Sequence, residues 1–165
     1  MRLKLNEIIN VPGEEVSFHY ELDVTDLKFD GITSMSDSLS IGGKVRNIAG
    51  MLVLTAKAEG EMVCTCSRCL EEFKRDIDLD IEAVLADELE DEDNPDIFLL
   101  DGDYIDVDEV VITHFVLNMD QKFLCSEDCK GLCEKCGKNL NDGPCDCKPD
   151  IDPRLAALQQ LLDNK

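Results

Sequence analysis

The sequence predicts an α+β protein with a β-rich body, one or two helices and a cysteine-rich module near the C-terminus. Three observations support this class. Long segments alternate apolar and polar residues with the period of two that is typical of half-buried strands. One apolar segment, Asp106–Met119, begins with acidic residues and is typical of a helix. Nine cysteines occur among 165 residues, most of them outside any apolar pattern.

Three segments carry the strand pattern most clearly. Val16–Leu22 is a short strand, and Met51–Val63 is a long run with high β propensity. Phe73–Val84 places apolar residues on one face and acidic residues on the other. Because the last two segments flank Cys64–Cys69, we expect a hairpin with these cysteines at its tip. Thr33–Gly43 is rich in Ser, Gly and Asp, and we expect a loop that leads into a strand.

The rest of the chain completes the expected domain organisation. Residues 1–124 should form the body, and the acidic run at 87–96 should form a loop within it. Residues 125–150 contain almost no apolar side chains, so this Cys-rich module cannot fold by hydrophobic burial alone. Residues 151–165 begin with a helix-capping Asp-Pro pair and carry a stripe of leucines. We expect this C-terminal helix to pack on the body; a groove on a partner is the alternative.

The charge of the chain is strongly acidic, with 37 acidic and 16 basic residues and a formal net charge of −21. Nucleic-acid affinity comes largely from Lys and Arg neutralising phosphates, so most of this surface should repel RNA and DNA. It should attract basic proteins instead, unless the acidity only confers solubility.

The N-terminal residues contain no apolar run long enough for a signal peptide, and no stretch of about 18 apolar residues occurs anywhere. We therefore expect a cytoplasmic protein with no membrane segment. The thiols of such a protein stay reduced.

Two C-x-x-C pairs, Cys66–Cys69 and Cys133–Cys136, predict metal knuckles. At this spacing a tight turn directs two thiolates at one tetrahedral ion. Gly137 follows the second pair and suits the left-handed turn that a knuckle often needs. Cys145 and Cys147 come after a turn-rich segment, so the region resembles a zinc ribbon. We therefore expect a zinc-knuckle hairpin on the body and a C-terminal zinc-ribbon-like module.

Cysteine roles that need no metal fit this pattern less well. Buried free thiols should follow an apolar pattern, disulfides need an oxidising compartment, and a thioredoxin-like C-x-x-C needs a βαβ context that is not recognisable. Zinc is favoured over an iron–sulfur cluster because the spacing matches neither ferredoxin pattern. We expect two zinc ions per chain.

Eight cysteines divide into two sites of four in more than one way, with Cys64 left over. In the favoured arrangement the last four form one site: Cys133, Cys136, Cys145 and Cys147. The other site then clips the hairpin tip to the segment after the helix, through Cys66, Cys69, Cys125 and Cys129. Such a cross-link joins distant residues and constrains the unfolded chain most. The rival arrangement places Cys125, Cys129, Cys133 and Cys136 in one site.

No catalytic pattern is recognisable. His19 and His114 are isolated and are predicted to be structural, and no phosphate loop, nucleophile elbow or Ser/His/Asp set is present. Metal sites closed by four thiolates leave no open position for Lewis-acid catalysis. We therefore do not expect an enzyme.

Two motifs carry a resemblance to a known family: Cys66–Phe73, and Cys125–Asn141 followed by Cys145-Asp146-Cys147 and Asp152–Leu155. They resemble the YceD family, called large ribosomal RNA subunit accumulation proteins. Cys64 is not part of the pattern. The resemblance implies a non-enzymatic role in the accumulation of large-subunit ribosomal RNA, and hence in ribosome assembly.

Three hypotheses remain for the molecular role. In the first, the protein is an assembly factor that binds a basic ribosomal protein or a pre-ribosomal particle, as its charge suggests. In the second it binds RNA through its knuckles, and the third is a redox or metal-handling protein. The second rests on the basic residues near the cysteines, which are Arg68, Lys130, Lys135, Lys138 and Lys148. No small-molecule substrate is expected.

Overall fold

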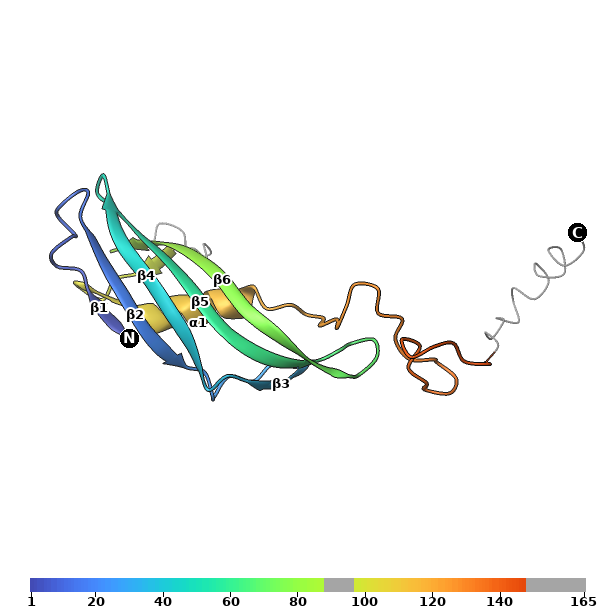
Figure 1. Ribbon diagram of the computed structural model, residues 1–165. Coiled ribbons are helices and arrows are strands. Elements are labelled where there is room, and N and C mark those ends of the chain that lie inside the picture. Colours follow the sequence, from blue (N-terminus) through green and yellow to red (C-terminus); the bar gives the residue numbers. More distant parts are fainter. Residues whose placement is uncertain (88–96, 148–165) are drawn as a thin grey trace, which may run out of the picture.

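One curved sheet forms the centre of the body in a computed structural model, which describes residues 1–87 and 97–147 (Figure 1). Its strands are β2 (Glu15–Asp23), β4 (Ser38–Ile48), β5 (Met51–Thr65), β6 (Glu72–Ala86) and β7 (Ile97–Leu99), in that order across the sheet. Neighbours are antiparallel except β6 and β7, which are parallel. A short strand, β3 (Ile32–Met35), pairs with the end of β5 beyond β4.

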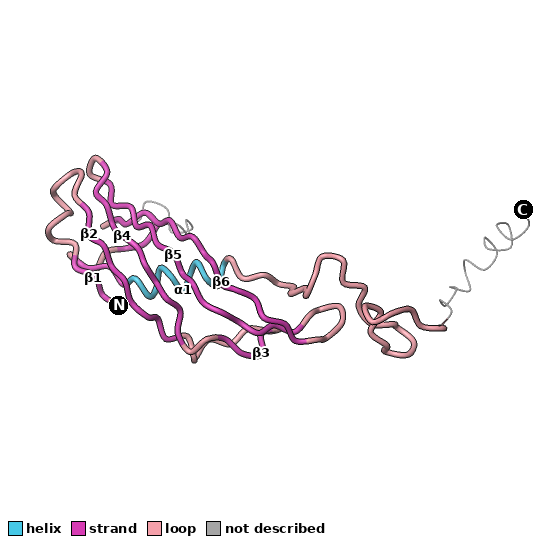
Figure 2. Tube along the Cα trace, in the orientation of Figure 1, coloured by secondary structure: helices cyan, strands magenta, loops and turns pink. Residues whose placement is uncertain are grey.

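A small second sheet leads into the helix. β1 (Arg2–Lys4) pairs antiparallel with β8 (Tyr104–Asp106), and α1 (Val107–Leu117) follows directly. The Asp106 carboxylate accepts a hydrogen bond from the backbone N–H of Asp108 and caps the helix, which confirms the helix predicted here. The buried residues of α1 join the inward side chains of the strands in one core, so α1 packs on one face of the sheet (Figure 2).

The predicted strands are confirmed as β2, β5 and β6. In β6, Ile77 and Ile81 are buried and the acidic residues between them are exposed, as the period of two requires. β5 and β6 pair antiparallel along their whole length as far as Thr65 and Glu72. The connection between them contains Cys66 and Cys69, so this cysteine pair lies at one end of the body (Figure 1).

The loop predicted at Thr33–Gly43 is wrong, because this segment forms most of β3 and the first half of β4. The reason is close packing at glycine. A Cβ atom at Gly43 would lie 2.7 Å from Cζ of Phe18 and 2.6 Å from the backbone oxygen of Thr55. Glycine here therefore lets the Phe18 ring pack closely against β4, and it does not mark a turn.

Residues 118–147 contain no helix and no strand longer than an isolated bridge, and they extend from the hairpin end of the body (Figure 2). The predicted helix at 151–165 and the acidic loop at 87–96, apart from Asp87, lie outside the described residues. Among the residues that are described, no helix has the length and apolar character needed to cross a membrane.

Two adjacent glycines of β4 offer a matched test of this packing. Gly43→Ala should destabilise the protein by about 1–3 kcal/mol because its Cβ would overlap the Phe18 ring and the neighbouring strand. Gly42→Ala should be neutral within about 0.5 kcal/mol, since its Cβ meets only Nδ1 of His19, at 3.4 Å. Urea unfolding of both variants measures the difference. Equal losses of stability would contradict the proposed packing.

Candidate metal centres

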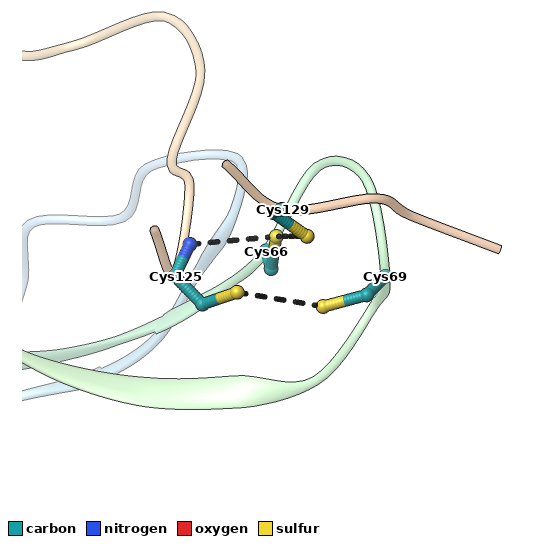
Figure 3. Close-up of side chains that lie close together, drawn as sticks. All are labelled: Cys66, Cys69, Cys125 and Cys129. Atoms are coloured by element: carbon teal, nitrogen blue, oxygen red, sulfur yellow. Dashed lines mark hydrogen bonds between the residues drawn. The ribbon is translucent and has the colours of Figure 1, made fainter. Parts of the chain in front are cut away.

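Eight of the nine cysteine sulfurs gather into two groups, and within each group all sulfurs lie within 4.8 Å of one another. The first centre consists of Cys66, Cys69, Cys125 and Cys129 (Figure 3). The second centre consists of Cys133, Cys136, Cys145 and Cys147. This is the grouping of the favoured arrangement above. All nine cysteines are free thiols.

The spacing of the sulfurs in the first centre fits a single tetrahedral ion. A metal–sulfur bond of about 2.3 Å requires sulfur ligands about 3.8 Å apart. Sγ of Cys66 lies 3.8 Å from Sγ of Cys129, and Sγ of Cys69 lies 3.7 Å from Sγ of Cys125 (Figure 3). A disulfide would bring two sulfurs to about 2.05 Å. The centre therefore has the geometry of four thiolates around one metal ion, with no room for the several iron atoms of a cluster.

Backbone amides stabilise a thiolate in each centre. Burial raises the pKa of the Cys66 thiol, but backbone N–H donors, led by those of Cys125 and Cys69, outweigh it and bring that pKa to about 6. In the second centre the backbone amides of Cys136 and Lys135 lower the pKa of Cys133 to about 6. Each C-x-x-C turn thus directs its own N–H groups at its first sulfur, which prepares that sulfur to bind a cation.

One further thiol in each centre shows the cost of crowding. The neighbouring sulfur of Cys129 raises the pKa of Cys125 to about 12, and Cys136 does the same to Cys147. Four adjacent thiols cannot all lose their protons unless a positive charge compensates them. A divalent ion supplies that charge and deprotonates its thiol ligands.

The two C-x-x-C turns share a backbone shape, although the residue after the second cysteine is leucine in one and glycine in the other. The N–H of Leu70 donates to the oxygen of Cys66 at 2.9 Å, and the N–H of Gly137 donates to that of Cys133 at 2.8 Å. Both donors have a positive φ, 60° at Leu70 and 70° at Gly137. The predicted left-handed turn at Gly137 is confirmed. Leu70 occupies the same conformation with a side chain that is 64% exposed.

The segment after α1 is held against the hairpin before it reaches Cys125. The ring of Phe123 is 2% exposed, and its backbone oxygen accepts a hydrogen bond of 2.8 Å from the N–H of Ser67. The guanidinium of Arg75 lies over this ring and pairs with Asp120 at 2.6 Å. These contacts bring Cys125 and Cys129 close to the hairpin tip.

The basic residues predicted to contact RNA or a partner lie in different surroundings. Nη1 of Arg68 donates to the backbone oxygens of Glu127 and Cys129, at 3.1 and 2.9 Å. Nζ of Lys138 donates to the oxygen of Pro144 at 2.8 Å. The contacts of Arg68 join the hairpin tip to the chain beside Cys129 at the first centre. The contact of Lys138 joins two parts of the loop at the second centre. Lys130 and Lys135 are exposed, and Lys148 lies outside the described residues.

Asn141 is a residue of the site that the spacing of the cysteines did not reveal. Its Nδ2 lies 3.3 Å from Sγ of Cys129 and lowers the pKa of that thiol. Its Oδ1 accepts a hydrogen bond of 2.8 Å from the backbone N–H of Lys130. The sequence does place this asparagine among turn residues close to cysteines, but that position does not indicate which sulfur its amide contacts.

The ninth cysteine, Cys64, and the two histidines lie outside the centres. Cys64 is fully buried in the core of the body, and burial raises the pKa of its thiol. His114 is buried, with Nδ1 2.9 Å from the oxygen of Val110 and its ring stacked on Phe98. His19 is exposed on β2.

The chain is similar to known proteins over the region that contains both centres. The family described as large ribosomal RNA subunit accumulation protein YceD matches residues 54–162. An uncharacterized protein of Bacillus subtilis, YlbN, is 24% identical over 169 residues, which cover 98% of this chain and 96% of the relative. Uncharacterized proteins of Mycobacterium tuberculosis and Mycobacterium bovis are 26% identical over 130 residues, or 75% of this chain. The match spans 62% of their length. No solved structure matches the chain.

The strained turn at Leu70 generates a prediction. Leu70→Gly should stabilise the hairpin tip by about 1 kcal/mol relative to Leu70→Ala, because both remove the exposed side chain but only glycine is unstrained at a φ of 60°. Hydrogen exchange of the tip amides in the metal-loaded protein measures the free energy of local opening. An alanine variant as stable as the glycine variant would show that this turn carries no strain.

Proposed function

Because the chain belongs to the YceD family of large ribosomal RNA subunit accumulation proteins, we propose that it is a non-enzymatic zinc-binding factor that supports ribosome assembly by binding a basic ribosomal protein. Membership of the family implies the role in large-subunit RNA accumulation. The zinc, the basic partner and a cytoplasmic location are the finer parts of the proposal. Each is supported by a separate property of the chain.

The donor set supports zinc in a structural role. Each centre offers four cysteine sulfurs, and a tetrahedral set of four thiolates is the ligand set of structural zinc sites. Apart from its cysteines, the segment 125–147 contains only two large aliphatic side chains, Leu132 and Leu140. Zinc would therefore contribute the folding free energy that a hydrophobic core supplies elsewhere. With four protein ligands bound, the ion has no position for a substrate.

The observation that carries the choice of partner is an acidic row on the outer face of the sheet. Along β6, successive outward positions are Asp76, Asp78, Asp80 and Glu82, and all four are exposed. Glu59 and Glu61 on β5 lie beside them. Lys57 and Lys74 form ion pairs within this surface, but the carboxylates outnumber them. A regular acidic face of this kind attracts a basic protein and repels phosphates.

RNA binding through the knuckles is the weaker alternative. Two of the basic residues that suggested it, Arg68 and Lys138, use their side chains to hold backbone oxygens next to the cysteines. Phosphate contacts there would compete with these hydrogen bonds.

The division into a body at 1–124, a zinc module at 125–150 and a C-terminal helix at 151–165 packed on the body also stays a proposal.

The zinc proposal predicts the metal content of the protein and its loss on mutation. Native mass spectrometry of the purified chain should find two zinc ions, and Cys136→Ser should leave one. In the same variant, hydrogen exchange should show residues 130–147 unprotected while β5 and β6 stay protected, because those strands have their own apolar core. A wild-type chain with fewer than two zinc ions, or a uniform loss of protection, would contradict the proposal.

The partner proposal predicts which charges matter. Replacing Asp76, Asp80 and Glu82 with their amides should weaken binding to purified basic large-subunit ribosomal proteins by about tenfold, because three carboxylates facing the partner are lost. Fluorescence anisotropy at low and physiological salt measures this change. The matched control replaces Glu134, Asp142 and Asp146, which are exposed acidic residues of the Cys-rich module, and should have little effect.

Reversing the charge of two lysines tests the alternative that RNA is the direct partner. In the Lys135→Glu, Lys138→Glu variant, binding to the basic protein should hold or strengthen. Loss of large-subunit RNA from cells carrying this variant, together with submicromolar binding of the wild type to naked ribosomal RNA and to no basic protein, would favour RNA as the direct partner.

A further inference from the structure

Asn141 belongs to the second centre by sequence but contacts the first. It lies between Cys136 and Cys145, both of which are in the second centre. Yet its Nδ2 is 3.3 Å from Sγ of Cys129, which is in the first. Asn141 is therefore a direct contact between the loop of one centre and a sulfur of the other.

A short ladder of hydrogen bonds places this amide. The backbone N–H of Lys130 donates to Oδ1 of Asn141, and the N–H of Leu140 donates to the oxygen of Gly131. Further along, Leu132 and Asn139 form a β-bridge, and the N–H of Cys133 donates to the oxygen of Lys138 at 2.8 Å. The segment 130–141 is thus a small hairpin. Its turn is the second C-x-x-C knuckle, and its open end lies at Cys129 and Asn141.

From this arrangement we infer that the two centres are a coupled pair: metal at the second centre closes the 130–141 hairpin and, through Asn141, strengthens metal binding at the first centre. Asn141 is the positioning residue of this coupling. The inference rests on the proposed function, since it requires two bound metal ions.

The physical basis is the hydrogen bond that Asn141 donates to a ligand. A donor in contact with a metal-bound thiolate fixes the direction of its lone pairs and offsets its charge, and loss of such a contact typically costs 10–100-fold in metal affinity. The amide can act in this way only while the hairpin holds it. A metal ion bound by Cys133 and Cys136 would hold the turn of that hairpin. By linkage, the first metal should strengthen binding of the second to the same degree.

Substitution of Asn141 by aspartate separates this role from local folding. Asp keeps the shape of the side chain and an oxygen for the N–H of Lys130, but it cannot donate to Cys129. In the full chain loaded with cadmium-113, Asn141→Asp should shift the NMR resonance of the first centre and leave that of the second in place; correlation of each cadmium resonance with the Hβ protons of its own cysteines assigns the two. Zinc release from the first centre to a chelator should accelerate by about tenfold. Asp142→Asn, an exposed change at the next residue, is the control and should alter neither.

A double-mutant cycle tests whether the coupling passes through Asn141. Zinc affinity of the first centre is measured by chelator competition in the wild type, in Asn141→Ala, in Cys136→Ser and in the double variant. Each single change should weaken the first centre by about tenfold, and the double variant should be no weaker than either single one.

The outcomes distinguish the failure of this inference from that of the proposed function. A wild-type chain that binds fewer than two metal ions overturns both. A wild type with two ions overturns only the coupling if Asn141→Asp leaves the first resonance and its zinc release unchanged. Additive losses in the double variant would also overturn it, because they would show that the second centre acts by another route or not at all.

Discussion

One constraint governs the path of the chain after α1: four thiols from two distant segments lie next to one another. Cys66 and Cys129 are 63 positions apart and Cys69 and Cys125 are 56 apart, yet all four sulfurs lie within 4.8 Å of one another. Without a cation such a group resists ionisation, whereas with one it becomes a cross-link. By the chain-entropy estimate, a cross-link that closes a loop of about 60 residues constrains the unfolded chain by about 4 kcal/mol. A metal ion bound at the first centre would therefore fix where the Cys-rich segment lies.

The body is built to present one half of that cross-link. β5 and β6 continue past the end of β4, and β3 takes the place of β4 beside the far part of β5. This extra pairing stiffens the part of the hairpin that carries Cys66 and Cys69. On the other side, the ion pair of Arg75 with Asp120 and the buried ring of Phe123 guide the returning chain. The protein scaffold thus brings both cysteine pairs together, and less ordering remains for the metal to impose.

Local patterns were sufficient to predict the parts of the structure whose geometry is local. The period of two in Phe73–Val84 predicted β6, and the acidic start of Asp106–Met119 predicted α1. The C-x-x-C spacing and the expected hairpin favoured the grouping of cysteines that the structure has, but they left the rival grouping open. Thr33–Gly43 was misjudged because Gly43 is required by the ring of Phe18, a contact between strands that the residues around Gly43 do not indicate. The contact of Asn141 with Cys129 could not be predicted for the same reason: it depends on how one centre lies against the other.

The charge of the metal centres bears on the identity of the partner. In a centre of this kind, four thiolates outweigh one divalent cation by two negative charges, so loading both centres makes an already acidic chain more negative. The basic residues beside the cysteines then have a local electrostatic role. Arg68 donates to the backbone oxygen of Cys129, one of the four cysteines of the first centre, and Lys138 closes the loop that leads to Cys145 in the second. A cation engaged in this way offsets the charge of its own centre and is less available to a phosphate. Two of the five basic residues that made RNA an attractive partner in the sequence, Arg68 and Lys138, thus serve the centres themselves, which agrees with the proposal that a basic protein meets the acidic outer face of β6.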